Sequence, residues 1–384
     1  MGSPNPQVIT LVASFATTEI QKIHDGRFCL CHPQWVVDVA AATLSGGDMD
    51  HMDPITMLDR VDELVSQRDR LSFSATVARH LVHRRAVSEV LLTDWRRTGA
   101  DAFVCAAQWS RSHSFYRVRN GRHDPLLLAE TIRQVGLLLC HEAYQVPSEH
   151  RFLMDRMAYD ADLDGLWAGA APAEIVVVVR AQELRRRTRS ASALRLDVEF
   201  LRDDAPFGWG AGWVHCIGPL MYQRIRSPQC PQATARQQQP PPVPPAEIGL
   251  HEADDVVLGQ CWQPGEWPLR ILTEHPVLFD HPLDHVPGML GLEGMRQASR
   301  AVLGWPDAQP TTCDIMFSRF IELDEPSCVR ATVQQRSAAS ARVLMVLAQT
   351  GHTAAQGTVT ITNLSCGNPT LDAPPCSTGN HCSA

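Results

Sequence analysis

Two stretches of this chain place the same charged motif, Glu-x-x-Arg-Gln, in otherwise apolar sequence. Glu130 and Arg133 belong to the first stretch, and Glu293 and Arg296 recur in the second, 163 positions later. An acid and an arginine three positions apart lie on one face of a helix and can form an ion pair. A helix that is apolar all round is buried, and charged residues are rarely buried unless they are paired or used in chemistry. The recurrence therefore indicates a duplicated domain with a carboxylate in each core.

Buried carboxylates of this kind are candidate general bases. Burial raises the pKa of a carboxylate, whereas a neighbouring guanidinium lowers it. If the two effects balance, Glu130 or Glu293 would accept a proton near neutral pH, and we take both glutamates with Arg133 and Arg296 as catalytic candidates. The alternative is a structural ion pair, which duplication would copy just as readily. The motif alone leaves both possibilities open.

Four histidines occupy the polar segments that precede the two helices. His113 and His281 lie seventeen and twelve positions before their glutamates, and His123 and His285 lie at the helix starts. An imidazole at a helix N-terminus has a lowered pKa and stays neutral, so it can accept a proton or donate a hydrogen bond. We therefore take His113 and His281 as catalytic candidates and His123 and His285 as substrate-binding candidates. Each of them taken alone would more often be an ordinary loop histidine.

The first residues of the two helices offer backbone N–H groups. Pro125 and Pro287 open the helices, and Gly288 follows the second proline. Unpaired N–H groups at a helix start can hold an oxyanion or a phosphate, and a glycine lets a substrate approach closely. Ordinary proline capping is the alternative. We add Gly288, and Asp280 beside His281, to the candidate substrate-binding residues.

Composition excludes several classes of protein. The chain has 384 residues, of which 44% are hydrophobic and 20% charged, which is a globular composition long enough for two domains. The formal net charge of −8 argues against nucleic-acid binding. No apolar run approaches the roughly 18 residues of a membrane span, and no signal peptide is recognisable, so we expect a cytoplasmic protein without membrane contact. The 12 cysteines form no CxxC pair, and P-loop, GxGxxG and zinc-site motifs are missing, so no metal and no cofactor are expected.

Strand patterns surround each apolar helix. Ala102–Trp109 and Leu269–Thr273 precede the helices, and Arg151–Tyr159 and Cys313–Leu323 follow them. β-branched and alternating patterns predict further strands at Glu174–Arg180, Leu194–Phe200, Val343–Ala348 and Gly357–Leu364. A sheet of this size needs its concave face covered, and the single helix is the only element long enough to do so. The sequence therefore predicts an α+β fold with two hotdog domains, each an antiparallel sheet wrapped around a central helix, which form an internal pseudo-dimer.

These elements divide the chain into five segments. We expect an N-terminal extension at residues 1–77, a first hotdog repeat at 78–224, a Pro- and Gln-rich linker at 225–247, a second repeat at 248–365 and a disordered tail at 366–384. The composition of the linker predicts an extended, unstructured chain.

A basic run falls between two predicted strands of the first repeat. It consists of Arg185, Arg186, Arg187 and Arg189. In an acidic protein, a local positive patch at a hairpin tip is a candidate docking site for an acidic partner. A solvated turn is the alternative.

Several longer segments resemble known enzyme families. Residues 279–298 resemble the loop and helix of hotdog β-hydroxyacyl-ACP dehydratases. The closer resemblance is to the A-factor synthase family of γ-butyrolactone biosynthesis, and it is carried by residues 90–96, 107–109, 113–116, 123–134 and 279–298. This resemblance spans about residues 78–364, and its segments are long enough to be specific.

The resemblance implies an acyltransferase. In that family a β-ketoacyl group moves from acyl carrier protein to a hydroxyl of dihydroxyacetone phosphate, and the ester then closes to a phosphorylated butenolide. In hotdog dimers the loop histidine of one unit faces the helix carboxylate of the other, so we expect His281 to approach Glu130, or His113 to approach Glu293. The helix arginines would balance phosphate or enolate charge, and the basic run would dock the acidic carrier protein.

Two rival functions remain open. A hotdog dehydratase or thioesterase acting on acyl carrier protein substrates would use the same elements, and a non-catalytic sensor of acyl lactones would use the same cavity. Arg133 and Arg296 stand where dehydratases have an apolar or small residue, which favours transfer to a charged acceptor over elimination. The sequence does not reveal which of the two repeat sites is active.

Overall fold

Each half of the protein consists of antiparallel strands and one long helix. The computed structural model describes residues 70–187, 190–226 and 239–364. The first half contains η1 (Arg79–Val82), η2 (Val87–Glu89), β1 (Leu92–Arg97), β2 (Ala102–Trp109), α2 (Leu126–Glu142), β3 (Arg151–Ala161), β4 (Ala173–Arg187), β5 (Ser190–Arg202), β6 (Ala205–Ile217) and α3 (Pro219–Arg226). The second half contains η3 (Pro245–Ile248), η4 (Ala253–Asp255), β7 (Glu266–Pro268), α4 (Gly288–Leu303), β8 (Gln309–Phe317), β9 (Ser327–Arg336), β10 (Ser340–Gln349) and β11 (His352–Thr362).

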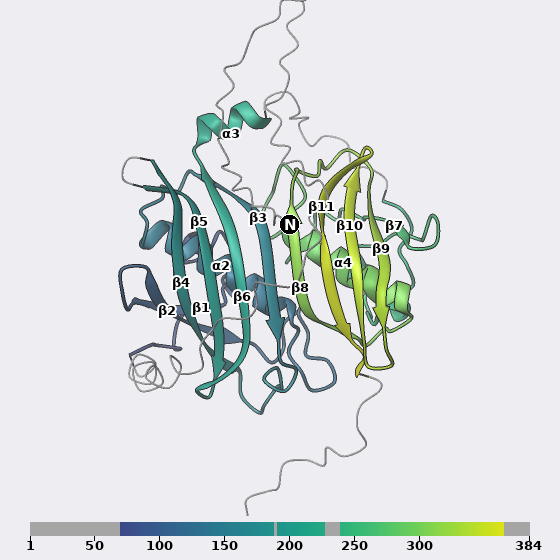
Figure 1. Ribbon diagram of the computed structural model, residues 1–384, viewed down its shortest axis with the longest axis horizontal. Helices are drawn as coiled ribbons and strands as arrows, with labels where there is room; N and C mark the ends of the chain where they lie inside the picture. The colour runs from purple at the N-terminus through teal and green to yellow at the C-terminus, as the bar shows by residue number, and fades with distance from the viewer. Residues whose placement is uncertain (1–69, 188–189, 227–238, 365–384) are drawn as a thin grey trace, which may run out of the picture. The chain divides into compact units, whose positions relative to one another are not determined.

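The strands form one continuous sheet of eleven strands (Figure 1). Their order is β1-β2-β4-β5-β6-β3-β8-β11-β10-β9-β7, so each half of the chain builds one half of the sheet. The two halves meet where β3 pairs with β8, from Arg156 opposite Met316 to Asp160 opposite Thr312. The guanidinium of Arg156 reinforces this joint by binding both carboxylate oxygens of Asp314 at 2.7 Å.

Helices α2 and α4 lie on the same side of the sheet (Figure 1). Helix α2 contacts β1, β2, β3, β5 and β6, and α4 contacts β8 to β11. Both helices are buried over most of their surface, because their apolar side chains face the sheet and the loops that cover them. The predicted α+β fold, with two helix-centred antiparallel units in an internal pseudo-dimer, is confirmed. No helix among the described residues is both long and apolar enough to cross a bilayer.

Strand β6, which the sequence patterns did not predict, owes its place to three alternating glycines. Gly208, Gly210 and Gly212 all face α2. A Cβ at Gly210 would collide with Ile132, and a Cβ at Gly208 would lie 3.0 Å from a methyl group of Leu128. The glycines therefore let the helix pack closely against the sheet. They also occupy the positions facing α2, where a buried strand would otherwise carry apolar side chains.

Two predicted strands are placed differently in the structure. The prediction at Leu269–Thr273 is wrong, because β7 ends at Pro268 and only the bridge between Leu258 and Leu269 continues the pairing. The prediction at Cys313–Leu323 is correct for β8 but too long, since β8 ends at Phe317. In both places the chain leaves the sheet to form loops that surround a cavity described below.

Part of the predicted linker packs onto the second half. The N–H of Val243 donates to the carbonyl of Leu258 at 3.0 Å, and the carbonyl of Pro241 accepts from Gln260 at 2.8 Å. These residues are extended, as expected from their prolines, but the expectation that they are unstructured is wrong for them. Residues 1–69, 188–189, 227–238 and 365–384 lie outside the described residues.

Candidate active site

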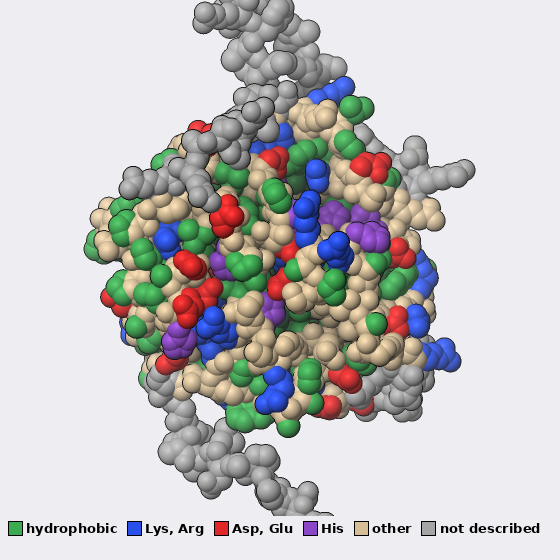
Figure 2. Space-filling model, turned by 180° about the vertical axis from the view of Figure 1, so that it is seen from behind, with side chains coloured by type: hydrophobic (Ala, Val, Ile, Leu, Met, Phe, Trp, Pro, Cys, Tyr) green, Lys and Arg blue, Asp and Glu red, His purple; other side chains and the backbone are tan. Residues whose placement is uncertain are grey.

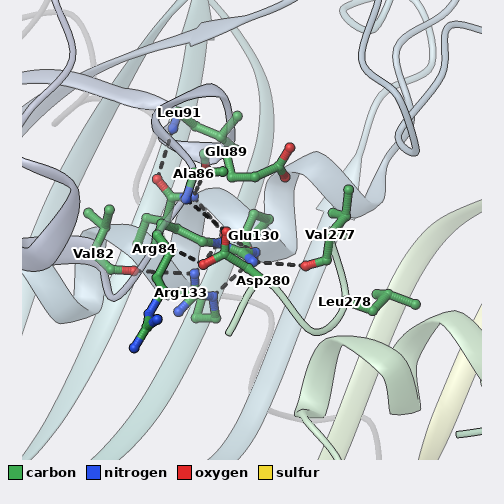
Figure 3. Close-up of polar contacts among 12 residues, drawn as sticks. Val82, Arg84, Ala86, Glu89, Leu91, Glu130, Arg133, Val277, Leu278 and Asp280 are labelled. Atoms are coloured by element: carbon green, nitrogen blue, oxygen red, sulfur yellow. Dashed lines mark hydrogen bonds and ion pairs between the residues drawn. The ribbon is translucent and has the colours of Figure 1, made fainter. Parts of the chain in front are cut away.

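Glu130 is the centre of a buried polar cluster on α2 (Figure 3). Its carboxylate accepts hydrogen bonds from Arg133 at 2.8 and 2.9 Å and from Gln134 at 2.6 Å, within its own helix motif. Arg84, from the segment between η1 and η2, lies 2.7 Å from the same carboxylate and also donates to the carbonyl of Val277 in the second half. With 2% of its side chain exposed, Glu130 holds two guanidinium groups in fixed positions.

These contacts lower the pKa of Glu130 to about 2. Burial by itself would raise the pKa, but the charges of Arg133 and Arg84 and the hydrogen bonds they donate outweigh it. The expectation of a pKa near neutrality is therefore wrong for this residue, because it allowed for one arginine where the fold supplies two. A carboxylate that stays ionised so far below neutral pH is a weak base, and its evident effect is to position Arg84 and Arg133.

The second copy of the motif makes a different set of contacts. Glu293 accepts a hydrogen bond from Gln297 at 2.6 Å and forms an ion pair with Arg296, with 2.5 Å between the charged atoms. Arg296, however, also forms an ion pair with Asp124, which precedes α2 in the opposite repeat. All three charged side chains are at most 2% exposed. Asp124 of the first repeat thus pairs with the guanidinium of Arg296, the motif arginine of the second repeat.

The hydrogen bonds of the two motif glutamines give the alignment of the repeats. Gln134 donates to the carbonyl of Glu89 at 2.8 Å, and Gln297 donates to the carbonyl of Asp255 at 2.9 Å. Counted from these residues, Arg84 corresponds to Leu250. Counted from the motif glutamates, Asp124 corresponds to Pro287. The first site therefore contains a cation, Arg84, where the second repeat has Leu250. The second site contains an acid, Asp124, which the first repeat contributes.

A cavity of about 1420 Å³ lies beside the first site. Arg84 and Arg133 line it, whereas Glu293 and Arg296 do not. Its walls come from α2 and the sheet of the first repeat and from residues 271–292 of the second. The cavity is thus built between the repeats, on the side of the sheet that carries the helices, and Figure 2 shows arginine, histidine and acidic side chains close together on this face.

The cavity is lined by both polar and apolar side chains. Its polar side chains include Arg84, Arg133 and Arg151 with several histidines, and its apolar walls include Ile132, Leu137, Leu196, Met289, Phe317 and Leu347. A volume of this size exceeds the range of about 300–1,000 Å³ that is common for small-ligand sites. It can therefore accommodate a polar head together with a long apolar chain.

Two histidines of the cavity are each paired with the preceding aspartate. His281 Nδ1 lies 3.3 Å from Asp280, whose oxygens also accept the backbone N–H groups of Arg85 at 2.5 Å and Ala86 at 2.9 Å. These backbone contacts fix the loop of the second repeat against the first. No hydrogen bond or ion pair within the described residues joins His281 to Glu130, so the loop faces the carboxylate cluster without direct contact between the two expected partners.

His285 is held more tightly. Its Nδ1 lies 2.7 Å from Asp284, which also accepts from the hydroxyl of Tyr222 at 2.7 and 2.8 Å and lies 3.2 Å from Arg226. Burial opposes ionisation of Asp284, but its hydrogen bonds to His285 and Tyr222 hold its pKa well below the ordinary value. Arg226 binds Glu322 through two further contacts at 2.6 and 2.8 Å. Helix α3, which the sequence did not predict, therefore attaches to the cavity loops.

A third imidazole, His83, faces the same cavity. Its Nε2 lies 2.9 Å from Nε2 of His141, whose Nδ1 lies 2.8 Å from the carbonyl of Val146. Because a carbonyl only accepts, a neutral His141 must receive the proton of His83 Nε2, which leaves Nδ1 of His83 unprotonated. Burial, followed by the charges of His141, Arg133, His281 and Arg151, lowers the pKa of His83 to about 3. His83 is thus neutral at ordinary pH.

The remaining predicted residues lie away from this cavity. His113 Nδ1 accepts the N–H groups of Phe115 and Tyr116 at 3.1 Å, and its Nε2 lies 3.4 Å from Glu89. Glu89, rather than Glu293, is thus its acidic partner among the described residues. His123 is fully buried, and neither of its ring nitrogens has a hydrogen-bond partner in the described part of the chain. Burial lowers the pKa of His123 to about 4.

The structural counterpart of His113 is His275, rather than His281. His275 Nδ1 accepts the N–H groups of Val277 and Leu278 at 3.2 and 3.1 Å, and its Nε2 lies 3.5 Å from Asp255. Both histidines therefore brace a loop. His113 and His281, which both precede a motif helix in the sequence, therefore do not occupy equivalent positions in the two repeats.

Five cavity residues were expected from the sequence, and others were missed. The expected residues that line the cavity are Arg133, Asp280, His281, His285 and Gly288. The lining residues that the sequence did not single out include His83, Arg84, Arg151, His275 and Asp284. Arg84 could in principle have been noticed from the sequence, because the corresponding residue of the second repeat, Leu250, is uncharged. Arg151 carries no such signal, because it is one arginine at the start of a strand.

Other predicted features are partly outside the described residues. Arg185, Arg186 and Arg187 belong to the end of β4, opposite the start of β5, but the positions of their side chains and of Arg189 are not described. Within the described ranges, His, Cys, Asp and Glu side chains form no group of three that could hold a metal ion.

Comparison with known proteins gives a family. The profile described as the A-factor biosynthesis hotdog domain matches residues 65–218 and 232–365. A protein of Streptomyces virginiae named 2-oxo-3-(phosphooxy)propyl 3-oxoalkanoate synthase is 42% identical over 67% of this chain and 87% of its own length. A protein of the same name from Streptomyces coelicolor is 36% identical over 71% of this chain and 86% of its own length.

Solved structures give a weaker likeness. An acyl-ACP thioesterase from Bacteroides thetaiotaomicron has 11% identity and a TM-score of 0.42, and the alignment covers 67% of this chain and 97% of that one. The assignment does not rest on it. Since the profile covers well over half of the chain, in both repeats, the protein belongs to the A-factor biosynthesis hotdog domain family.

Proposed function

We propose that this protein is an acyltransferase that moves a β-ketoacyl group from a thioester to a hydroxyl of dihydroxyacetone phosphate, in the cavity beside Glu130. The product would be the ester named in its relatives, a 2-oxo-3-(phosphooxy)propyl 3-oxoalkanoate. The observation that carries the proposal is the cavity itself, whose lining combines apolar side chains with arginines and carboxylate-paired histidines. Such a cavity suits both an acyl chain and a charged acceptor.

The base in this proposal is His281. The attacking hydroxyl must lose a proton, and a neutral imidazole accepts one at ordinary pH. Asp280 orients the ring through Nδ1, and the backbone of the first repeat holds Asp280 in turn. Glu130 serves as the anchor of Arg84 and Arg133, since its low pKa makes it a poor proton acceptor. His285 is a second candidate base, held by Asp284 at the same cavity.

The start of α4 is suited to stabilise the reacting carbonyl. Gly288 and Met289 line the cavity, and N–H groups in the first turn of a helix have no acceptor within that helix. No side chain caps this helix start. As the hydroxyl oxygen attacks the thioester carbon, the carbonyl oxygen becomes negative, and these N–H groups would bind it. The tetrahedral intermediate then expels the thiolate, which takes up a proton to leave as the thiol, and the ester remains.

The second site is proposed to be structural. The ion pair between Asp124 and Arg296 uses the guanidinium that would otherwise meet a substrate. The boundaries at residues 78–224 and 248–365 accordingly describe, in our proposal, two repeats that share one working site.

We further propose that the thioester donor is carried by acyl carrier protein. The net charge of −8 makes a general attraction between this protein and an acidic carrier unfavourable, so docking would need a local basic surface. The run of arginines at the end of β4 is the surface we propose.

A direct assay tests the proposed reaction. The purified protein is incubated with a β-ketoacyl thioester and dihydroxyacetone phosphate, and products are followed by mass spectrometry. We expect the phosphorylated ester and free thiol in equal amounts. Free β-keto acid without ester would identify a thioesterase, an enoyl thioester would identify a dehydratase, and unchanged substrates with tight binding of an acyl lactone would identify a sensor.

A further inference from the structure

We propose that Arg133 and Arg151 form a subsite for the phosphate group of a small acceptor, and that this subsite gives the protein its preference for phosphorylated over unphosphorylated acceptors. The inference rests on the proposed function for the identity of the acceptor. It adds the place where the phosphate binds and a residue, Arg151, that neither the repeated motif nor the family resemblance indicates.

Arg133 has one side of its guanidinium free. Its Nε and Nη2 are bound to Glu130, and Nη2 lies 3.4 Å from the carbonyl of Val82. Its Nη1 has no hydrogen-bond acceptor within the described residues. The side chain lines the cavity and is 23% exposed, so Nη1 is available to a ligand while Glu130 keeps the group in place.

Arg151 faces the same cavity from the first position of β3. No acidic side chain in the described part of the chain forms an ion pair with it, and its nearest described aromatic contact is the ring of Tyr222, with 5.7 Å between the guanidinium carbon and the ring centroid. His83 lies between the two arginines: its ring packs against Phe152, the neighbour of Arg151, with 5.1 Å between the ring centroids, and the carbonyl of Val82, the neighbour of His83, lies 3.4 Å from Arg133 Nη2. Burial, and after it the charges of groups that include both arginines, lowers the pKa of His83. Guanidinium groups bind phosphate oxygens through paired hydrogen bonds.

The charges of the cluster favour an anion. Glu130 balances only one of its two arginines, which leaves one positive charge there in addition to that of Arg151. Acidic side chains line the cavity too, and four of them are already bound: Asp280 to backbone N–H groups and His281, Asp284 to His285 and Arg226, Glu322 to Arg226, and Asp155 to His215. A phosphate monoester carries about −1.5 to −2 charges at pH 7. It therefore matches this end of the cavity better than a neutral hydroxyketone does.

The test compares two acceptors that differ only in the phosphate. The full chain and its variants receive dihydroxyacetone phosphate or dihydroxyacetone, with one β-ketoacyl thioester at a fixed concentration. We expect Arg151→Met to raise KM for the phosphorylated acceptor roughly 10- to 100-fold, which is the range for loss of a charged hydrogen bond. Transfer to dihydroxyacetone should stay within about twofold, and Arg151→Lys should fall between wild type and Arg151→Met.

A matched control removes a different arginine. Arg195 pairs with Asp197 on β5 and does not line the cavity, so Arg195→Met should leave both KM values unchanged. Circular dichroism confirms that each variant is folded. If Arg151→Met keeps the phosphate preference, or weakens both acceptors equally, the subsite is wrong although acyl transfer stands.

Calorimetric titration with inorganic phosphate separates the subsite from the reaction. Wild type should bind phosphate at least tenfold more tightly than Arg151→Met at the same ionic strength. If wild type transfers acyl groups to neither acceptor, the proposed function fails, and this titration still decides the subsite. Equal phosphate binding by wild type and Arg151→Met would overturn it.

Discussion

Asp124 of the first repeat is ion-paired with Arg296 of the second, and both side chains are buried. The corresponding position of Asp124 in the second repeat is Pro287, so the matching arginine of the first repeat, Arg133, meets no acid from the opposite repeat and instead faces the cavity. Together with Arg84, which corresponds to Leu250, this makes two exchanges of residue type between the two copies of the motif. The two halves are similar in fold and different in chemistry.

The two motif glutamates should respond differently to the same substitution. Glu130→Gln releases Arg84 and Arg133 beside the cavity, so we expect the rate of ester formation, kcat/KM, to fall at least tenfold. Glu293→Gln alters buried contacts among side chains that do not line the cavity, so kcat/KM of the folded protein should stay within about threefold while Tm falls. Steady-state kinetics and thermal unfolding of both variants measure this. Equal loss of activity in both would show that the second site also works.

Asp124 should matter for stability. Removing one partner of a buried ion pair costs about 3–5 kcal/mol. Because Arg296 keeps Glu293 as a second acidic partner, we expect Asp124→Asn to lower the free energy of unfolding, measured by urea denaturation, by an amount near the lower end of that range. The double variant Asp124→Asn with Arg296→Met should be less stable than the single variant, because it also leaves the buried carboxylate of Glu293 without its arginine. A single variant as stable as wild type would contradict this account.

His281 should affect turnover more than binding. His281→Gln removes the proposed base, and general base catalysis contributes about 10²- to 10⁴-fold, so kcat should fall within this range while KM for dihydroxyacetone phosphate changes little. Asp280→Asn should have a smaller effect on kcat. His352→Gln, at an exposed histidine at the start of β11, is the control. If His285→Gln abolishes turnover and His281→Gln does not, the base is His285.

Acid should destabilise the protein through His83. Its pKa in the folded protein is about 3, below the ordinary 6.5, so the folded state keeps it neutral while the unfolded chain takes up a proton. Stability from this residue is therefore complete above about pH 6.5 and decreases as the pH falls from there towards 3. We expect the Tm of wild type to fall more steeply than that of His83→Gln between pH 7 and pH 4.5. Parallel curves would mean that His83 titrates normally.

The carrier-docking proposal predicts an effect that depends on the donor. Reversing the charges of Arg185, Arg186 and Arg187 to glutamate should reduce kcat/KM for a β-ketoacyl group on acyl carrier protein about tenfold or more, with a loss that is larger at low salt. The same variant should process a short synthetic thioester at the wild-type rate. Equal rates with the carrier-bound donor would exclude this surface.

The sequence by itself determined the architecture and the location of the polar motifs. An apolar helix that carries Glu-x-x-Arg-Gln is recognisable because local periodicity reports burial, and two copies imply two helix-centred sheets. The strand β2 at Ala102–Trp109 was predicted to the residue for the same reason. Strand β6 was missed, since glycines that serve the packing of α2 occupy the positions where a strand facing the core would otherwise carry apolar side chains.

Only the tertiary structure decided which copy of the motif opens onto a cavity and what its carboxylate does. Arg84 reaches Glu130 from 46 positions away, and Arg296 meets Asp124 across 172 positions. Contacts over such separations depend on how the sheet brings the two repeats together, and no local pattern encodes them. The pKa of a buried acid is set by the sum of the charges around it, so one unanticipated arginine was enough to turn a candidate base into an anchor.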